Sequence, residues 1–503
     1  MVLLVLLGTA FASLLNPQED LDKVIQKSIE LDRYNEVTCK RPSVKEFVHL
    51  WNNLNHKCLE TDQNDFVYVS YKAHLNATRQ AIKQEVNFVW SNYKKHAWGS
   101  DTILPVSGKP FDAFGSISYM IHSSLDSLFL MGNLTDFKEA LEYSVTTGKE
   151  IHTSEYIQDL VGGLLSAYFL SGEPLALEKA KQAGELLWKI YTYRRELLPY
   201  PFFNLTTGQG TVPDKIVKSS ELLNLSELLV LYKLTNSQNY QRVINSLENL
   251  IQEKSKDLSF LPISFFTREF KRMQPRFGGS FILNSQGAHL HRYLFNNWLL
   301  SGHSYFKELY DRTKWKVIDL ALTNQEGKLF IPVVTERGDT RHELHQASCA
   351  WAGQLAIENL LKDYNSTEVG FAKKLMETCL EMFSEKELPS STFKFSKEST
   401  EPLPGGFELH SEVFEGLFHL YRLTGDQRYR KVSMSIFEKV KAQCKAQYGY
   451  STLDQEGKQT DTMPSSFLSK TLKYLYLLHS SETFLKEAKY LFTPRGHIFK
   501  YIS

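Results

Sequence analysis

The stretch Ser154–Glu173, SEYIQDLVGGLLSAYFLSGE, decides the fold class. Its apolar residues recur with the i, i+3, i+4, i+7 spacing of a helix buried along a broad stripe: Ile157, Leu160, Val161, Leu164, Leu165, Tyr168 and Phe169. Ser154 is a suitable N-cap, and Glu155 then lies in the first turn, where the helix dipole favours a carboxylate. Gly162 and Gly163 each cost about 1 kcal/mol relative to Ala in mid-helix. The pair therefore predicts that another helix passes very close.

Similar helical patterns continue on both sides of this stretch. From about residue 78 onward, helices of comparable length follow one another, and turn signals such as Thr424-Gly425-Asp426 separate them. Strand signals are short and fall between the helices. The length of 503 residues alone would allow about three domains. The unbroken series of about seven helix pairs instead predicts an all-α toroid of helical hairpins with short β-hairpins in its loops.

The first residues indicate a secretory route. Val2–Leu7 is a short apolar run, and Ala10-Phe11-Ala12 is a small-x-small cleavage pattern, so residues 1–12 are predicted to be a signal peptide. Residues 13–77 show no strong period and are predicted to be an N-terminal extension. No later segment is apolar enough to span a bilayer, so no transmembrane segment is expected. The net charge of +1 gives no reason to expect nucleic acid as a partner.

Glycosylation sequons agree with this route. Each is a weak pattern by itself. Asn224 lies in a predicted helix and is not expected to be modified. The sites predicted to carry glycans are Asn76, Asn133, Asn204 and Asn365.

Several motifs together resemble class I α-1,2-mannosidases, glycoside hydrolase family 47. They are HAWGSDTILPVS (96–107), SLDSLFLMGN (124–133), VGGLLSAY (161–168) and LKYLYLL (472–478). LPYPFFNLTTG (198–208) and YLFTPRGH (490–497) resemble the ER degradation-enhancing branch of that family. The resemblance implies an (α/α)7 barrel over residues 78–503. It also implies an ER-lumenal protein that acts on high-mannose N-glycans in glycoprotein quality control.

The resemblance also implies one disulfide. Cys349 in HQASCAWAG and Cys379 in METCLEMF match the family's bonded pair. Cys39 and Cys58 could form a second, N-terminal pair. Cys444 is then odd, either a buried thiol or a site of intermolecular pairing, and the buried thiol is favoured.

Inverting glycosidases need one carboxylic acid and one carboxylate, roughly 6.5–9.5 Å apart, so that a water fits between them. By resemblance, the catalytic positions are Glu155 and Glu412, and Glu412 is the better candidate for the base. The resemblance also assigns glycan contacts to Asp126 and Glu415, of which Glu415 lies three residues after Glu412 on the same helix face.

Other functional positions of the family have changed. Asp159 stands where the family has an Arg, and it would repel Glu155. Ala288 replaces a catalytic Asp and Arg292 replaces a Glu, and neither a methyl group nor a permanently protonated guanidinium acts as a base. His289 and His291 flank this position, and the simpler interpretation is that both are packing or surface histidines.

The family's calcium site has changed as well. By the resemblance, Pro494 stands at the position of the calcium-ligating Thr, and Thr493 is one position off. Lys470 and Arg495 stand where the family has glutamates. Pro464 replaces a further Glu. Ca²⁺ requires several oxygen ligands. We therefore expect no calcium and no other cofactor, and no His, Cys or Asp cluster has ligand spacing for another metal.

Three functions remain open from the sequence. The first is a catalytically impaired homologue that binds high-mannose glycans or misfolded glycoproteins. The second is an active mannosidase with a site rearranged around Glu155, Glu412 and Glu415. The third is a protein-binding scaffold without sugar affinity, coupled to an ER oxidoreductase through Cys444. The sequence by itself does not decide whether the chain is an enzyme.

Overall fold

The computed structural model describes most of the chain after residue 65. The described residues are 66–143, 150–192, 198–212, 216–258, 261–266, 276–278, 285–334, 339–361, 365–384, 387–481, 484–485 and 490–500. The predicted signal peptide and the Cys39–Cys58 pair lie outside them. The chain divides into two compact units, residues 1–82 and 83–503. Helix α4 (Phe66–His96) begins in the first unit and ends in the second.

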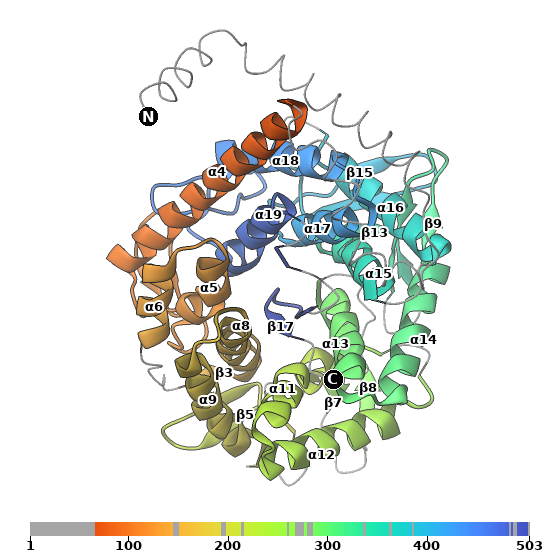
Figure 1. Ribbon diagram of the computed structural model, residues 1–503. Coiled ribbons are helices and arrows are strands. Elements are labelled where there is room, and N and C mark those ends of the chain that lie inside the picture. The colour runs from red at the N-terminus through yellow and green to blue at the C-terminus, as the bar shows by residue number, and fades with distance from the viewer. Residues whose placement is uncertain are drawn as a thin grey trace, which may run out of the picture. The chain divides into compact units, whose positions relative to one another are not determined.

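The second unit is an (α/α)7 barrel, as predicted (Figure 1). Its inner helices follow one another around the ring (Figure 1). They are α5 (Tyr119–Leu130), α8 (Gly162–Ser171), α11 (Ser226–Thr235), α13 (Ser285–Ser301), α15 (Ala350–Leu361), α17 (Glu412–Thr424) and α19 (Lys473–Leu478). The outer helices are α6 (Leu134–Glu142), α9 (Pro174–Thr192), α12 (Gln238–Ser255), α14 (Ser304–Leu320), α16 (Ser366–Glu381), α18 (Arg428–Cys444) and the second part of α4.

The inner and outer helices differ in burial. Every described side chain of α17 from Glu412 to Arg422 is buried, whereas α12 buries one stripe of an otherwise polar helix. An inner helix touches neighbours on all sides, so it tolerates few exposed positions. The core of the unit is therefore the packed wall of the ring.

Short antiparallel sheets connect the helices. They are β1–β2 (Thr102–Ile103, Pro110–Phe111), β3–β4–β5 (Glu150–His152, Phe202–Asn204, Gln209–Thr211), β6–β7–β8 (Ile216–Lys218, Ser264–Phe266, Arg276–Gly278), β9–β10 (Leu322–Thr323, Leu329–Phe330), β11–β12 (Val333–Val334, Thr340–Arg341), β13–β14–β15 (Glu343–His345, Thr392–Phe395, Thr400–Pro402) and β16–β17 (Tyr490–Phe492, Ile498–Lys500). The β16–β17 hairpin lies inside the ring of helices, where β17 packs on α8 (Figure 1). It therefore brings the segment between its strands to the barrel interior.

The stretch that decides the fold is helical but not a uniform α-helix. A short α7 (Thr153–Glu155) leads into the π-helical turn η2 (Tyr156–Val161) and then into α8. The N-cap residue is His152, so the predicted cap at Ser154 is wrong. Ser154 Oγ instead accepts a hydrogen bond from Gln158 Nε2 (2.7 Å). Isolated π-helical turns often mark functional sites, and this one lies between Glu155 and the buried α8.

The glycine pair marks close helix contact, as predicted. A Cβ on Gly163 would lie 2.2 Å from the carbonyl oxygen of His122 in α5. A Cβ on Gly162 would lie 3.2 Å from the ring of His497, next to β17. Glycine therefore allows α8 to approach both α5 and the C-terminal hairpin.

The cysteines of the barrel agree with the sequence analysis. Cys349 and Cys379 form a disulfide that joins the 3₁₀ turn η4 (Gln346–Cys349) to α16. Cys444 is a free, buried thiol, and burial raises its pKa to about 12. A thiol with such a pKa is protonated at neutral pH and is a poor nucleophile.

The sequons differ in exposure. Asn224 is 1% exposed, which agrees with the expectation that it is not glycosylated. Asn76 is exposed, whereas Asn133, Asn204 and Asn365 are partly exposed. Glycosylation of these four residues stays a prediction.

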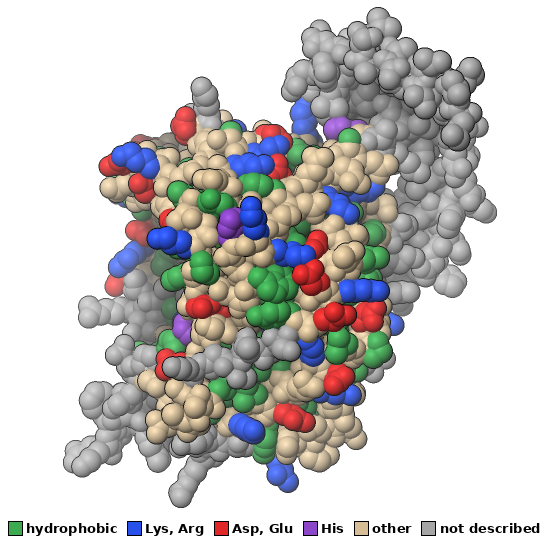
Figure 2. Space-filling view, turned by 90° about the vertical axis from the view of Figure 1, so that its left-hand side faces the viewer, with side chains coloured by type: hydrophobic (Ala, Val, Ile, Leu, Met, Phe, Trp, Pro, Cys, Tyr) green, Lys and Arg blue, Asp and Glu red, His purple; other side chains and the backbone are tan. Residues whose placement is uncertain are grey.

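The face of the molecule drawn in Figure 2 carries charges of both signs. Lys and Arg side chains alternate with Asp and Glu over the face in Figure 2, and no large area of one sign is visible. None of the described helices combines the length and the hydropathy that a membrane span requires.

Candidate functional site

The predicted site residues meet where inner helices begin. Glu155 and Asp159 belong to α7 and η2, and Glu412 opens α17. A second π-helical turn, η5 (Phe467–Leu472), carries Lys470 into the same region. Arg495 comes from the turn of the β16–β17 hairpin. Both π-helical turns of the described chain therefore supply charged side chains to one cluster.

Glu415 is held by two cations of the chain itself. Lys470 Nζ lies 2.7 Å from Glu415 Oε2, and Arg292 Nη2 donates to Glu415 Oε1 at 3.0 Å. All three side chains are about 3% exposed. Arg292 is further fixed by hydrogen bonds to Gln354 and to the carbonyl oxygen of Phe492. Glu415 is thus part of an enclosed ion-pair network.

Glu412 is surrounded by basic side chains. Its Oε1 lies 3.5 Å from Lys470 Nζ and 3.9 Å from His289 Nε2, and its Oε2 lies 3.5 Å from His410 Nδ1. Burial alone would raise the pKa of Glu412, but Lys470, His410 and His289 outweigh burial and hold this pKa well below its ordinary value. A carboxylate with such a low pKa is a weak general base near neutral pH.

Glu155 and Asp159 share one guanidinium. Arg495 Nη2 donates to Glu155 Oε1 at 3.2 Å, and Arg495 Nε lies 3.3 Å from Asp159 Oδ2. Arg495 Nε also donates to Gln158 Oε1 at 2.8 Å. From the sequence, Asp159 was expected to repel Glu155. That expectation needs correction, because the cation between them comes from the far end of the chain.

Asp126 is completely enclosed. Lys473 Nζ donates to both of its oxygens at 2.9 Å, and His497 Nδ1 and Ser166 Oγ each lie 2.9 Å from Oδ2. Burial alone would raise the pKa of Asp126, but Lys473 and His497 lower it to about 2. Direct glycan contact by Asp126 or Glu415 stays a prediction, and both carboxylates are occupied by internal partners.

The two histidines beside Ala288 have different surroundings. His291 stacks on Tyr310 (centroids 4.0 Å apart) and contacts Trp351, so it is a packing residue, as expected. His289 faces Glu412, and burial and Lys470 hold its pKa well below the ordinary value. A neutral His289 can exchange hydrogen bonds but adds no fixed charge.

Two buried carboxyl groups were missed by the sequence analysis. Glu227 in α11 is fully buried, and neither oxygen has a hydrogen-bond partner among the described residues. Burial raises the pKa of Glu227 to about 8 and that of Glu221, in α10 (Ser219–Leu222), to about 7. The sequence does contain a signal for both residues, because each glutamate interrupts an apolar run in SSELLNLSELL.

The oxygen donors of this charged cluster, which we call the barrel floor, do not fit a calcium ion. Thr493 Oγ1 already accepts the backbone N–H of His497 (3.1 Å). Glu155, Glu415 and Asp126 are all paired with Lys or Arg of the chain. Ca²⁺ takes six to eight oxygen ligands. Carboxylates already neutralised by fixed cations cannot supply that set.

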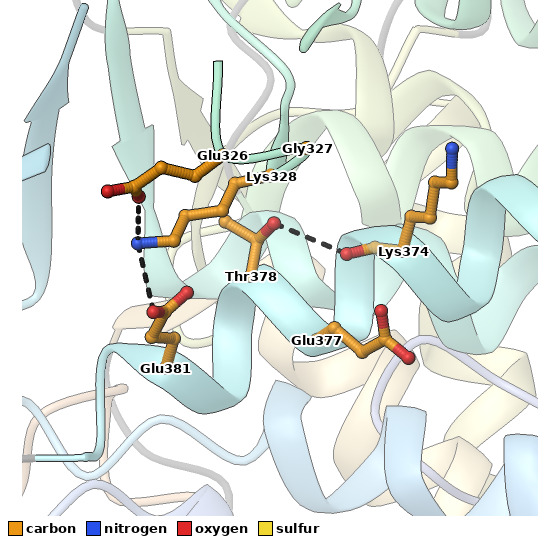
Figure 3. A pocket seen from close by; sticks show the side chains of 7 residues that line it. All are labelled: Glu326, Gly327, Lys328, Lys374, Glu377, Thr378 and Glu381. Atoms are coloured by element: carbon orange, nitrogen blue, oxygen red, sulfur yellow. Dashed lines mark hydrogen bonds and ion pairs between the residues drawn. The ribbon is translucent and has the colours of Figure 1, made fainter. Parts of the chain in front are cut away.

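A separate surface pocket contains none of these residues. It has a volume of about 390 Å³ and is lined by Glu326, Gly327, Lys328, Lys374, Glu377, Thr378 and Glu381 (Figure 3). Lys328 is paired there with Glu326 and Glu381 (Figure 3). None of the predicted site residues lines this pocket, so it is not a candidate active site.

Solved structures share the architecture of this barrel. An α-1,2-mannosidase from Trichoderma reesei superposes with a TM-score of 0.76 at 17% identity, over 85% of this chain and 99% of that one. A cellobiose 2-epimerase from Spirochaeta thermophila gives 0.53 at 10% identity, over 81% and 98%. These likenesses show the fold.

Sequence similarity defines the family. Residues 85–501 match glycosyl hydrolase family 47, and the chain belongs to this family. It is 26% identical to mannosyl-oligosaccharide alpha-1,2-mannosidase IA of Drosophila melanogaster over 86% of this chain and 69% of that protein. It is also 26% identical to the endoplasmic reticulum mannosyl-oligosaccharide 1,2-alpha-mannosidase of Homo sapiens, over 84% of this chain and 64% of that protein.

Proposed function

We propose that this protein is a catalytically impaired family 47 member that binds high-mannose N-glycans, or glycoproteins that carry them, in the ER lumen. The observation that carries the proposal is the internal pairing of the retained carboxylates. Glu155 is bound to Arg495, while Glu412 and Glu415 are bound to Lys470. Each cation lies in a motif where the family has acidic or oxygen-donating residues, so the site neutralises itself.

Two further features support weak or absent hydrolysis. Ala288 is a methyl group at the position of a catalytic Asp. Glu412, the remaining candidate base, has a pKa held far below the range that suits a general base. Loss of one general acid or base alone typically lowers a rate by about 10²–10⁴.

Glycan binding is supported by partly exposed polar side chains in the same cluster. His289 Nε2 makes no hydrogen bond among the described residues and lies 3.9 Å from Glu412 Oε1. His289 and Arg495 are each 24% exposed. Sugar hydroxyls donate and accept hydrogen bonds, so they suit such a mixed set. Relatives named as acting on mannosyl-oligosaccharides support the choice of ligand.

The compartment is inferred from independent features. The apolar start of the chain, the sequons, the Cys349–Cys379 disulfide and the ER-named relatives all support the secretory pathway. The resemblance of LPYPFFNLTTG and YLFTPRGH to the degradation-enhancing branch supports a role in glycoprotein quality control. The burial of Cys444 does not favour coupling to an oxidoreductase through this thiol.

The decisive experiment measures hydrolysis and binding on the same purified protein. Release of mannose from a high-mannose oligosaccharide is followed with Ca²⁺ and with chelator, and binding is followed by calorimetry. We expect saturable binding without measurable release. His289→Ala should weaken binding at least fivefold, whereas the control His303→Ala, at a surface His–Glu pair, should not.

Other results would select the other functions. Robust turnover that disappears in Glu412→Gln would identify an active mannosidase with a rearranged site. Absence of both turnover and glycan binding would leave the protein-binding scaffold.

A further inference from the structure

A cluster outside the paired carboxylates has the composition of a metal site. His345, Glu408 and His410 each offer one ligand atom, and the three atoms lie within 4.8 Å of one another. His410 Nε2 lies 3.1 Å from Glu408 Oε2, and the rings of His345 and His410 have centroids 4.8 Å apart. Local sequence spacing did not predict this cluster, because His345 lies far from the other two residues along the chain. We propose that these three side chains bind a Zn²⁺ ion, independently of the function proposed above.

The ligand set selects zinc over calcium or magnesium. Imidazole nitrogens suit Zn²⁺ and related transition metals, whereas Ca²⁺ and Mg²⁺ prefer oxygen. Two histidines, one carboxylate and one position for water are a familiar zinc arrangement. Zn²⁺ bonds of about 2.0–2.2 Å place ligand atoms roughly 3.4 Å apart, so small side-chain movements bring this cluster to ligating distance.

The surrounding structure already orients one ligand. Glu412 Oε2 lies 3.5 Å from His410 Nδ1, on the opposite side of the ring from Glu408. Metal-bound histidines commonly donate their second N–H to a carboxylate, which fixes the tautomer and the ring orientation. Glu412 would therefore be a positioning residue for this site rather than a ligand.

The ligands lie next to regular elements of the barrel. His345 ends β13 and leads through η4 into α15, and His410 leads into α17. These two helices cross closely, since a Cβ on Gly353 would lie 3.1 Å from the Cα of Gly416. Between the ligands Glu408 and His410, the buried Leu409 has a φ of 53°, a conformation that non-glycine residues rarely adopt.

Binding has two identifiable costs. His345 Nδ1 accepts the backbone N–H of Ala347 at 3.2 Å, and ligation through either ring nitrogen loses this hydrogen bond. Zn²⁺ also competes with protons for the ligating nitrogens and the carboxylate, so its affinity falls as the pH is lowered. Both costs reduce the affinity, and the titration is therefore done at pH 8.

The test uses the full chain after removal of metals with a chelator. Calorimetric titration with ZnCl₂ should show one equivalent bound with a Kd of about 10 μM or tighter. Co²⁺ should give the visible absorption of a protein-bound ion. Glu408→Gln, His345→Ala and His410→Ala should each weaken zinc binding at least tenfold, and Glu408→Gln is conservative because this side chain is 61% exposed.

His303→Ala is the matched control. His303 Nδ1 lies 3.1 Å from Glu248 Oε2, so it forms a similar His–carboxylate pair without the second histidine. Its replacement should leave zinc affinity within twofold of the wild type. Circular dichroism confirms that each variant is folded. No uptake by the wild type, or an affinity unchanged in Glu408→Gln, would overturn the proposal.

Discussion

Asp126 shows how a retained acidic residue takes a structural role. Its carboxylate and the Lys473 ammonium are both fully buried and 2.9 Å apart. Removal of one partner of a buried pair leaves an uncompensated charge, which typically costs about 3–5 kcal/mol. Asp126→Asn should therefore lower the free energy of unfolding by about that amount, as measured by thermal and urea unfolding.

A surface pair provides the comparison for Asp126. Asp136 lies 2.8 Å from Lys94, but both side chains are about 30% exposed. Asp136→Asn should change stability by less than about 1 kcal/mol, because exposed ion pairs contribute little. Equal effects of the two substitutions would show that Asp126 is not a structural anchor.

Glu227 predicts a pH-dependent stability. Burial raises its pKa from an ordinary value near 4.5 to about 8, so the folded state holds a proton that the unfolded state releases. The contribution of Glu227 to the free energy of unfolding is fully present below about pH 4.5. It falls by roughly 1.4 kcal/mol per pH unit as the pH rises to about 8.

Glu227→Gln removes the ionisable carboxyl group at this position and leaves every other ionisable group in place. The variant should therefore gain melting temperature relative to the wild type as the pH is raised from 5 to 8. The difference between the two proteins isolates Glu227, because all other ionisable groups are shared. A difference that does not change with pH would show that the pKa of Glu227 is ordinary.

At the residue level, the sequence identified the acids but not their partners. Glu155, Glu412 and Glu415 were found because they are retained at positions that match the family's motifs. Arg495 and Lys470 were interpreted as losses, since each was compared only with its own motif. Their pairing with carboxylates more than 50 residues away along the chain depends on tertiary structure, which local patterns do not encode.

At the level of elements, α8 depends on its contact with α5. A Cβ on Gly163 would lie 2.2 Å from a backbone oxygen, and no flexible side chain can move to relieve that clash. Gly163→Ala should destabilise the barrel by at least about 1–3 kcal/mol. Gly370 in α16 has no atom within 4 Å of its Cβ position, so Gly370→Ala should stabilise by up to about 1 kcal/mol.

Thermal unfolding of both glycine variants checks this prediction. A stabilising or neutral Gly163→Ala would mean that α8 and α5 have room to separate. The periodicity of residues 154–173 predicted this helix and its close neighbour correctly. It did not predict the π-helical turn, because one inserted residue leaves the apolar spacing on either side nearly unchanged.

At the level of the whole molecule, the ion pairs join elements from around the ring. Arg292 of α13 meets Glu415 of α17, Lys470 of η5 meets the same carboxylate, and Lys473 of α19 meets Asp126 of α5. Arg495 links the C-terminal hairpin to α7 and η2. Fixed cations therefore hold the barrel floor together where the family is expected to use a divalent ion.

This replacement predicts that the wild-type barrel melts at the same temperature in 1 mM Ca²⁺ and in chelator. A micromolar calcium site would add about 4 kcal/mol at a thousandfold excess of ligand, which is easily detected. Lys470→Glu is the informative variant, because it places a third carboxylate beside Glu412 and Glu415. Repulsion should lower its melting temperature in chelator, and Ca²⁺ should recover part of the loss. A wild-type melting temperature that rises by several degrees with Ca²⁺ would instead show that the floor still binds the ion despite its internal cations.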